Sequence, residues 1–197
     1  SGTINVASNI AATGDMTINS GNFTSGANQI SAPNVSILGT FNAPTAAGLL
    51  TVSGDIVNNG TFNRNGGTVV FNGNSSILGT VNPSFNNITI SGILTPPVTL
   101  NIHGAFTNNG VFNNGGTGTV AFLGTTGVTQ VVSGTTVTNF ANINVTNTSA
   151  SPDVTIESNQ NLLGVLTLAN TATVDADGAS DNSVFTLISS GDNPTQD

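Results

Sequence analysis

The sequence predicts an all-β chain folded as a parallel β-helix, or β-solenoid, with right-handed coils. Three observations carry this prediction: a long internal repeat, short runs in which apolar residues alternate with polar ones, and the absence of helical periodicity. If each coil takes roughly 17 to 25 residues, the chain makes about 8 to 11 coils. Right-handed crossovers are the default between parallel strands.

The repeat has a period of about fifty residues. Segment 50–73 reads LTVSGDIVNNGTFNRNGGTVVFNG, and segment 100–124 returns as LNIHGAFTNNGVFNNGGTGTVAFLG, so that Leu50 matches Leu100. Shorter echoes join 36–42 to 76–82 and 85–90 to 140–145. We therefore expect one domain over 1–197, made of two clear units, 50–99 and 100–153, and two weaker ones, 1–49 and 154–197.

The strands are predicted from apolar residues two positions apart. This period places one face of each strand in a core, and Val, Ile, Thr and Phe favour extended backbone. In chain order the alternating sets are Leu50 and Val52; Val69 and Phe71; Ile88 and Ile90; Val98, Leu100 and Ile102; Val120 and Phe122; Ile143 and Val145; Val154 and Ile156; Leu166 and Leu168. The chain has 10 Phe residues, and we expect those between 50 and 145 to fill the interior.

The turns between the strands leave two architectures open. Asn-Gly at 59, 65, 72, 109 and 114 supplies the positive φ of sharp turns and also suits hairpins, so an antiparallel sandwich is the alternative. A repeated strand-and-turn pattern favours the solenoid, because stacked coils turn Phe, Ile, Val and Asn positions into ladders. Stacked like charges would repel, which fits a chain with only 5% charged residues.

The charge balance disfavours two classes of partner. Arg64 is the only basic residue besides one histidine, and the formal net charge is −8. Without cations to neutralise phosphates, we expect neither nucleic-acid binding nor attraction to anionic membranes. Cysteine is absent, so disulfides and thiolate metal sites are excluded, and no apolar run is long enough for membrane insertion.

Four segments carry a resemblance to a known group of proteins: TVVFNG at 68–73, SGTTVTNFANINVTN at 133–147, VTI at 154–156 and GVLTLANTATVDADG at 164–178. They resemble the Asn/Thr/Gly-rich β-solenoid repeats of large bacterial cell-surface adhesins, which are of the filamentous-haemagglutinin and autotransporter type. The likeness is strongest to the surface proteins that the type IX system exports. The resemblance implies a secreted, cell-surface location, a structural role as a shaft or filament subunit, and a surface glycan or a host or biofilm ligand as partner.

One local motif suggests a metal. The run from Asp175 to Asn182 gives Asp175, Asp177 and Asp181 the spacing of an oxygen-rich loop, with Gly178 for the turn, and such loops hold calcium. Against a full calcium loop, Thr173 stands at the first ligand position and Val184 at that of the bidentate glutamate. A solvated acidic turn is the alternative. Calcium is the only cofactor that the sequence suggests.

The sequence does not predict an enzyme. His103 matches Ser53 in the other copy, Arg64 matches Asn114 and Asp55 matches Ala105, and charges that vary between copies indicate solvent-facing positions. Several β-helix proteins act on polysaccharides, so a carbohydrate-binding or carbohydrate-active protein is the alternative. The nine acids are scattered, however, and Trp and Tyr are absent as sugar platforms. The Thr-x-Thr runs occupy unlike positions of the repeat, which disfavours an ice-binding face.

The two ends carry the strongest functional hint. No amphipathic capping helix is predicted at either end, and an uncapped solenoid exposes unpaired backbone donors and acceptors at its terminal coils. Two hypotheses follow: the coils continue into further repeats, or subunits self-associate head to tail into a fibre.

Overall fold

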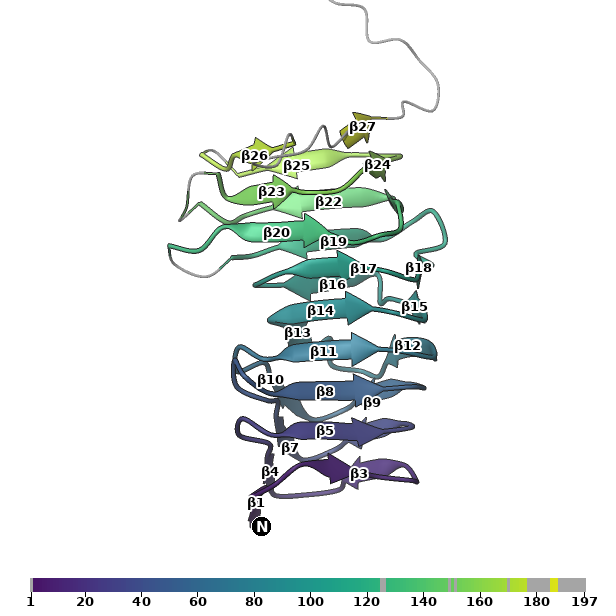
Figure 1. The fold of residues 1–197 in the computed structure, drawn as a ribbon, viewed down its shortest axis with the longest axis vertical. Helices are drawn as coiled ribbons and strands as arrows, with labels where there is room; N and C mark the ends of the chain where they lie inside the picture. The colour runs from purple at the N-terminus through teal and green to yellow at the C-terminus, as the bar shows by residue number, and fades with distance from the viewer. Residues whose placement is uncertain are drawn as a thin grey trace, which may run out of the picture.

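The structure of the chain is a computed structural model that describes residues 2–124, 127–148, 150, 152–169, 171–176 and the backbone of 185–187. These residues form no helix, and their parallel strands stack as a β-solenoid of about eight turns. The solenoid fold is therefore confirmed, and the antiparallel sandwich is wrong. Figure 1 shows an upright rod with the N-terminus at its lower end.

Each coil contributes one strand to each of three faces. Every pairing between coils is parallel and joins a strand to the third one after it, as in β5 to β8 to β11. Face A holds β1 Thr3–Asn5, β4 Asn22–Thr24, β7 Thr40–Asn42, β10 Thr61–Asn63, β13 Ser84–Phe85, β16 Thr99–Ile102, β19 Thr119–Phe122, β22 Asn142–Val145 and β25 Leu166–Leu168. Face B, which runs up the front of Figure 1, holds β2 Ile10–Ala11, β5 Gln29–Ala32, β8 Leu49–Val52, β11 Thr68–Phe71, β14 Asn87–Ile90, β17 Phe106–Asn108, β20 Gln130–Ser133, β23 Val154–Ile156 and β26 Val174–Asp175. Face C holds β3 Met16–Ile18, β6 Val35–Ile37, β9 Ile56–Asn58, β12 Asn74–Leu78, β15 Ile93–Thr95, β18 Val111–Phe112, β21 Thr138–Phe140, β24 Gln160–Leu162 and β27 Phe185–Leu187.

The coils differ in length because their corners differ. Ser84 pairs with Asn101, 17 residues later, whereas Phe106 pairs with Val132, 26 residues later. The predicted range of coil lengths is therefore close to the observed one. Loops at the corners absorb the extra residues, and the strands stay in register.

The fifty-residue repeat is not a whole number of coils. Leu50 lies in β8 on face B, but its repeat partner Leu100 lies in β16 on face A. Eight strands separate the two copies while one coil uses three, so the second copy is displaced by two and two-thirds turns. The repeat-related residues Leu50 and Leu100 therefore do not lie over one another. Each copy instead stacks on itself, because β8 pairs with β11 and β16 pairs with β19.

The core is a set of ladders of inward-facing side chains. We call the one that runs the whole length of face A the long ladder. Its strand pairings and one ring contact give the order Ile4, Phe23, Phe41, Phe62, Phe85, Ile102, Phe122, Val145 and Leu168. Phe23 and Phe41 stack with their ring centroids 5.6 Å apart and 12° between planes.

Most of the predicted core is buried as expected, including Phe71, Phe85, Phe106, Phe122 and Phe140. Val98 is an exception, because it is exposed and lies outside β16. The preceding residues Pro96 and Pro97 lack the N–H groups that a strand ladder needs, which explains why the strand begins only at Thr99.

Side-chain amides join neighbouring coils at the corners. Oδ1 of Asn34 accepts a hydrogen bond from the backbone N–H of Asp55 at 2.7 Å, and Oδ1 of Asp55 accepts one from the N–H of Ser76 at 2.7 Å. Oδ1 of Asn87 likewise accepts from the N–H of Ala105 at 2.8 Å. These bonds satisfy backbone donors where the chain leaves a strand. They give corner asparagines such as Asn34 and Asn87 a structural role.

A second corner arrangement, which we call the Asn-Gly clamp, occurs twice at repeat-related places. The buried Asn58 lies below Gly79, and the buried Asn108 lies below Gly134 in the same way. Both glycines have positive φ, +116° and +133°, and a Cβ on either would lie about 2 Å from the carbonyl oxygen of the asparagine. Only glycine fits this close approach.

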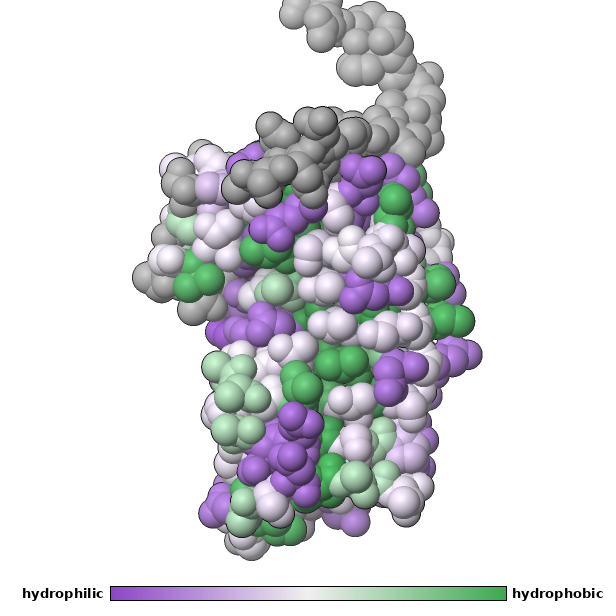
Figure 2. Space-filling view, in the orientation of Figure 1, coloured by the Kyte–Doolittle hydropathy of each residue, from purple (hydrophilic) through white to green (hydrophobic). Residues whose placement is uncertain are grey.

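The surface is covered by neutral polar residues with apolar ones interspersed. Figure 2 shows this mixture on the side that faces the viewer. Exposed apolar side chains include Leu38, Leu78 and Val111, which lie at or beyond the ends of strands. Amides and hydroxyls supply the hydration that charges give most proteins.

Candidate functional site

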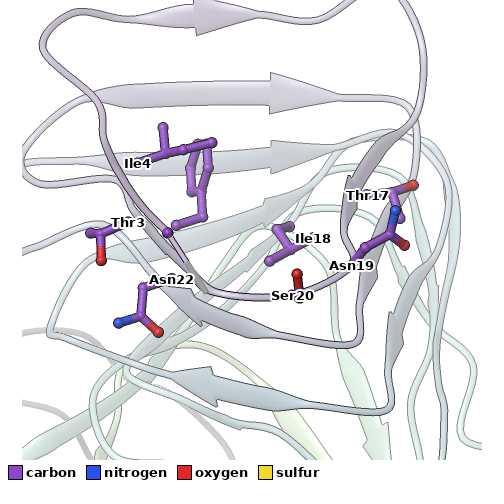
Figure 3. A pocket seen from close by; sticks show the side chains of 9 residues that line it. Thr3, Ile4, Thr17, Ile18, Asn19, Ser20 and Asn22 are labelled. Carbon is purple, nitrogen blue, oxygen red and sulfur yellow. The ribbon is translucent and has the colours of Figure 1, made fainter.

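The first candidate site is the open N-terminal end of the solenoid. A hollow of about 360 Å³ lies there, lined by residues of β1, β3 and β4 and by the turn around Ser20. Figure 3 shows Ile4 and Ile18 beside this hollow, with the polar Asn19, Ser20 and Asn22 at its margin. The floor is therefore the interior of the first coils, seen end-on.

Both ends of the long ladder are exposed. Ile4 is 63% exposed, whereas its neighbour Phe23 is 9% exposed. At the other end Leu168 is 44% exposed, whereas its neighbour Val145 is fully buried. Ile10 at the start of face B is exposed too, although Ile30 above it is buried. The ladder is therefore buried in the coils next to its ends and exposed at Ile4 and Leu168 themselves.

The second candidate site lies where a sheet is interrupted. On face A one sheet ends at β10 and the next begins at β13, and the gap is bridged by the rings of Phe62 and Phe85, whose centroids are 5.2 Å apart. On face C a similar break separates β18 from β21, bridged by Phe112 and Phe140 at 6.1 Å. The two breaks follow repeat-related strands, so the repeat builds one break on each of two faces.

A surface hollow of about 530 Å³ opens at the face A break. Its lining comes from three successive coils: Phe62, Asn63, Arg64 and Asn65 from β10 and the turn after it, Ser84 from β13, and His103 from the corner after β16. The corner between β13 and β14 is Asn86 alone, whereas residues 64–67 connect β10 to β11. The short corner leaves room between the Arg64 turn and His103.

His103 has a defined proton arrangement. Its Nδ1 lies 2.8 Å from the carbonyl oxygen of Gly124, and because a carbonyl only accepts, Nδ1 carries the proton. In the neutral ring Nε2 is therefore a hydrogen-bond acceptor. Burial lowers the pKa of His103 and the Arg64 charge lowers it further, while the bond to Gly124 acts in the opposite direction. The neutral form is therefore favoured.

The structure places the residues predicted for calcium only in part. Asp175 ends β26, where it pairs with Thr155, while Asp177 and Asp181 lie outside the described residues. Within the described ranges no three His, Cys, Asp or Glu side chains lie close enough together to hold a metal ion. The calcium loop therefore stays a prediction.

The charged residues that vary between repeat copies are less exposed than expected. Asp55, Arg64 and His103 are each partly buried at corners. Asp55 takes part in the hydrogen-bonded series of the corners, as described above. In the part of the chain that the structure describes, no helix is long and apolar enough to cross a membrane.

Sequence reasoning missed the hollow at the face A break. Arg64 and His103 are far apart in the chain, and only the coil geometry brings them to one hollow. A signal was present, since each is the chain's single residue of its kind and each departs from its repeat partner. Asp153 was also missed: it is buried, and its carboxylate accepts hydrogen bonds from the N–H of Ala150 and of Thr173.

Searches with this chain find no matching family model, no matching curated protein and no matching solved structure.

Proposed function

We propose that this chain is a structural shaft, a filament subunit that stacks head to tail with further copies of itself. The single observation that supports this most is the exposure of the long ladder at both ends, at Ile4 and at Leu168. Each is an apolar side chain whose inner neighbour is buried, so each offers an apolar surface on which a further coil could stack.

The two ends are complementary in chemistry. Leu168 of one copy beneath Ile4 of the next would continue the long ladder in the direction it already runs. The strand edges at each end carry backbone N–H and C=O groups spaced for a parallel neighbour, and stacking would pair them at the ordinary spacing of about 4.8 Å. Because the contact joins unlike ends, it does not close and yields a filament.

The setting we propose is the bacterial cell surface, as a secreted fibre of adhesin type. The resemblance of segments 133–147 and 164–178 to surface repeats supports this setting, and so does a surface rich in neutral amides. No catalytic role is part of the proposal. Immunogold labelling of intact cells of the source organism tests it, and label confined to the cell interior would overturn it.

The stacking is tested by analytical ultracentrifugation and negative-stain electron microscopy of the purified chain across a range of concentrations. We expect rods with an axial repeat of about 40 to 50 Å per copy, from nine rungs of about 4.8 Å. Ile4→Asp and Leu168→Asp should each abolish elongation, because they place a charge in the stacked ladder. Leu38→Asp, at an apolar side chain exposed on the lateral surface, is the matched control and should leave filaments intact.

A chain that stays monomeric at every concentration would overturn the filament subunit. Filaments that form equally well in the Ile4→Asp and Leu168→Asp variants would overturn the end-to-end geometry. Lateral bundles without axial growth would do the same.

A further inference from the structure

The hollow at the face A break combines groups that a shaft does not need. Arg64 is partly buried there, and among the described residues no carboxylate forms an ion pair with it. Although the whole chain carries a net charge of −8, Arg64 is its only arginine, so this hollow holds the one guanidinium that a carboxylate could pair with. A guanidinium binds a carboxylate with two parallel hydrogen bonds.

The second break of the chain provides an internal comparison. There the residue that corresponds to Arg64 is Asn114, whose Nδ2 donates to the carbonyl oxygen of Asn139 at 3.0 Å across the break. Phe85 pairs with Ile102 and Phe140 pairs with Leu162, so the residue that corresponds to His103 is Leu163. A break in this fold therefore needs neither the arginine nor the histidine.

The remaining lining suits a sugar. Phe62 is partly exposed, whereas the other phenylalanines whose burial is described are buried, and its apolar face lines the hollow. The amides of Asn63 and Asn65 and the hydroxyl of Ser84 offer donors and acceptors for hydroxyl groups. The volume of about 530 Å³ lies within the range of small-molecule sites.

We infer that the hollow at the face A break is a binding site for a carboxylate-bearing saccharide, with Arg64 holding the carboxylate, Phe62 contacting the sugar face and His103 lying close enough to Arg64 to sense the bound charge. This site goes beyond the structural role and does not depend on stacking. It commits the chain to an acidic glycan as ligand.

Proton uptake by His103 accompanies binding in this arrangement. Arg64 is the only other charged side chain in the lining, and the Gly124 carbonyl holds Nδ1–H from the neighbouring coil. A bound carboxylate offsets the repulsion between Arg64 and the imidazolium, so it raises the pKa of His103. By linkage, affinity for the acidic saccharide rises as the pH falls through that pKa.

The test uses the full chain and a galacturonic acid oligomer as the probe. Since His103 is the only histidine, its C2–H signal gives a clean NMR titration with and without the probe. We expect the pKa of His103 to rise in the presence of the oligomer and calorimetric affinity to increase several-fold from neutral pH to mildly acid pH. Neutral galactose oligomers should produce no rise in that pKa.

Two substitutions replace residues of the hollow by those that stand at the corresponding positions of the second break, Asn114 and Leu163. The fold already accommodates these residue types at such a break. Arg64→Asn should weaken binding about tenfold or more, the effect expected for loss of a charge-assisted pair. His103→Leu should retain binding at neutral pH and lose its dependence on pH. The double variant Arg64→Asn with Asn114→Arg keeps the net charge and should not restore binding, because Phe112, which corresponds to Phe62 at the second break, is buried and offers no ring face to a sugar.

Several outcomes overturn the proposal. One is an unchanged pKa of His103 and no measurable heat with the oligomer. Another is equal binding by wild type and Arg64→Asn, both with unaltered circular dichroism. If sodium sulfate or acetate alone gives the same pKa rise at equal charge concentration, the hollow is a simple anion site and the saccharide assignment is wrong.

Discussion

Asn59 and Thr80 are joined across neighbouring coils through one oxygen atom. Oδ1 of Asn59 accepts the backbone N–H of Thr80 at 2.9 Å and its hydroxyl at 3.0 Å. Asn109 and Thr135 repeat this pair at 2.9 and 3.2 Å on another face of the rod. The repeat therefore preserves the contact between one coil and the next, whichever face carries it.

The Asn-Gly clamp predicts which glycines tolerate substitution. Gly79→Ala and Gly134→Ala should each lower the free energy of unfolding by about 2 kcal/mol or more, because the new methyl group meets a backbone oxygen and φ is positive. Gly14→Ala is the matched control, since no atom lies within 4 Å of its Cβ position. Chemical denaturation measures all three, and equal losses at Gly14 and Gly79 would contradict the clamp.

Replacing the buried Asn58 by aspartate should make the stability of the fold depend on pH. The Nδ2 of Asn58 donates to the carbonyl oxygen of Val81 at 3.0 Å, while its Oδ1 has no partner. Asn58→Asp places a carboxyl beside that carbonyl, so the pKa of the new group rises and its charge costs roughly 3 kcal/mol or more at neutral pH. The lost stability should return as the pH falls and the group is protonated.

The control for this variant is its exposed neighbour. Asn59→Asp should cost much less and show little recovery in acid, because water solvates the charge. Thermal melts of both variants from neutral pH to about pH 4 measure the difference. If the melting temperatures of the two variants changed with pH in the same way, position 58 would be accessible to water and the prediction would be wrong.

Core phenylalanines should differ according to their place in the long ladder. Phe122→Ala should lower the free energy of unfolding by about 3 to 5 kcal/mol, since this ring is buried between β16 and β22 neighbours. Phe62→Ala should cost distinctly less, because that ring is partly exposed at the break. Urea denaturation of both variants measures the gap, which would vanish if the hollow closed in solution.

His103 should make the fold less stable in acid. Its pKa is lowered in the folded chain from 6.5, so the folded state binds fewer protons than the unfolded state. The stability contributed by the neutral ring is present above pH 6.5 and is lost as the pH falls through the lower, folded pKa. Comparison with His103→Leu across this range isolates the effect, and identical pH profiles would contradict it.

The fold could be predicted from the sequence because its signal is local. Apolar residues two positions apart, such as Leu50 and Val52 or Ile143 and Val145, show that one face of a strand is buried. This holds whichever face of the rod the strand belongs to. The stacking partners could not be predicted in the same way. The strand of Leu100, β16, pairs with β13 below it and with β19 above it, where Leu100 lies next to Val120. Its repeat partner Leu50 lies in neither of these strands.

The site was harder to foresee because it depends on corners. The hollow forms where the single residue Asn86 turns the chain above a longer turn that carries Arg64. The length of each corner decides which residues of successive coils meet. That length could not be predicted from the sequence. The exposure of Ile4 and Leu168, by contrast, follows from their places in the first and last strands of face A.

The phase difference between repeat and coil has a consequence for any tandem array of this unit. Each copy advances eight strands around a three-sided shaft, so three copies pass before a given side chain returns to its starting face. A feature encoded once per unit is thereby distributed as a screw around the rod. Such a fibre offers its ligands to every direction of approach, although each copy carries the feature on one side alone.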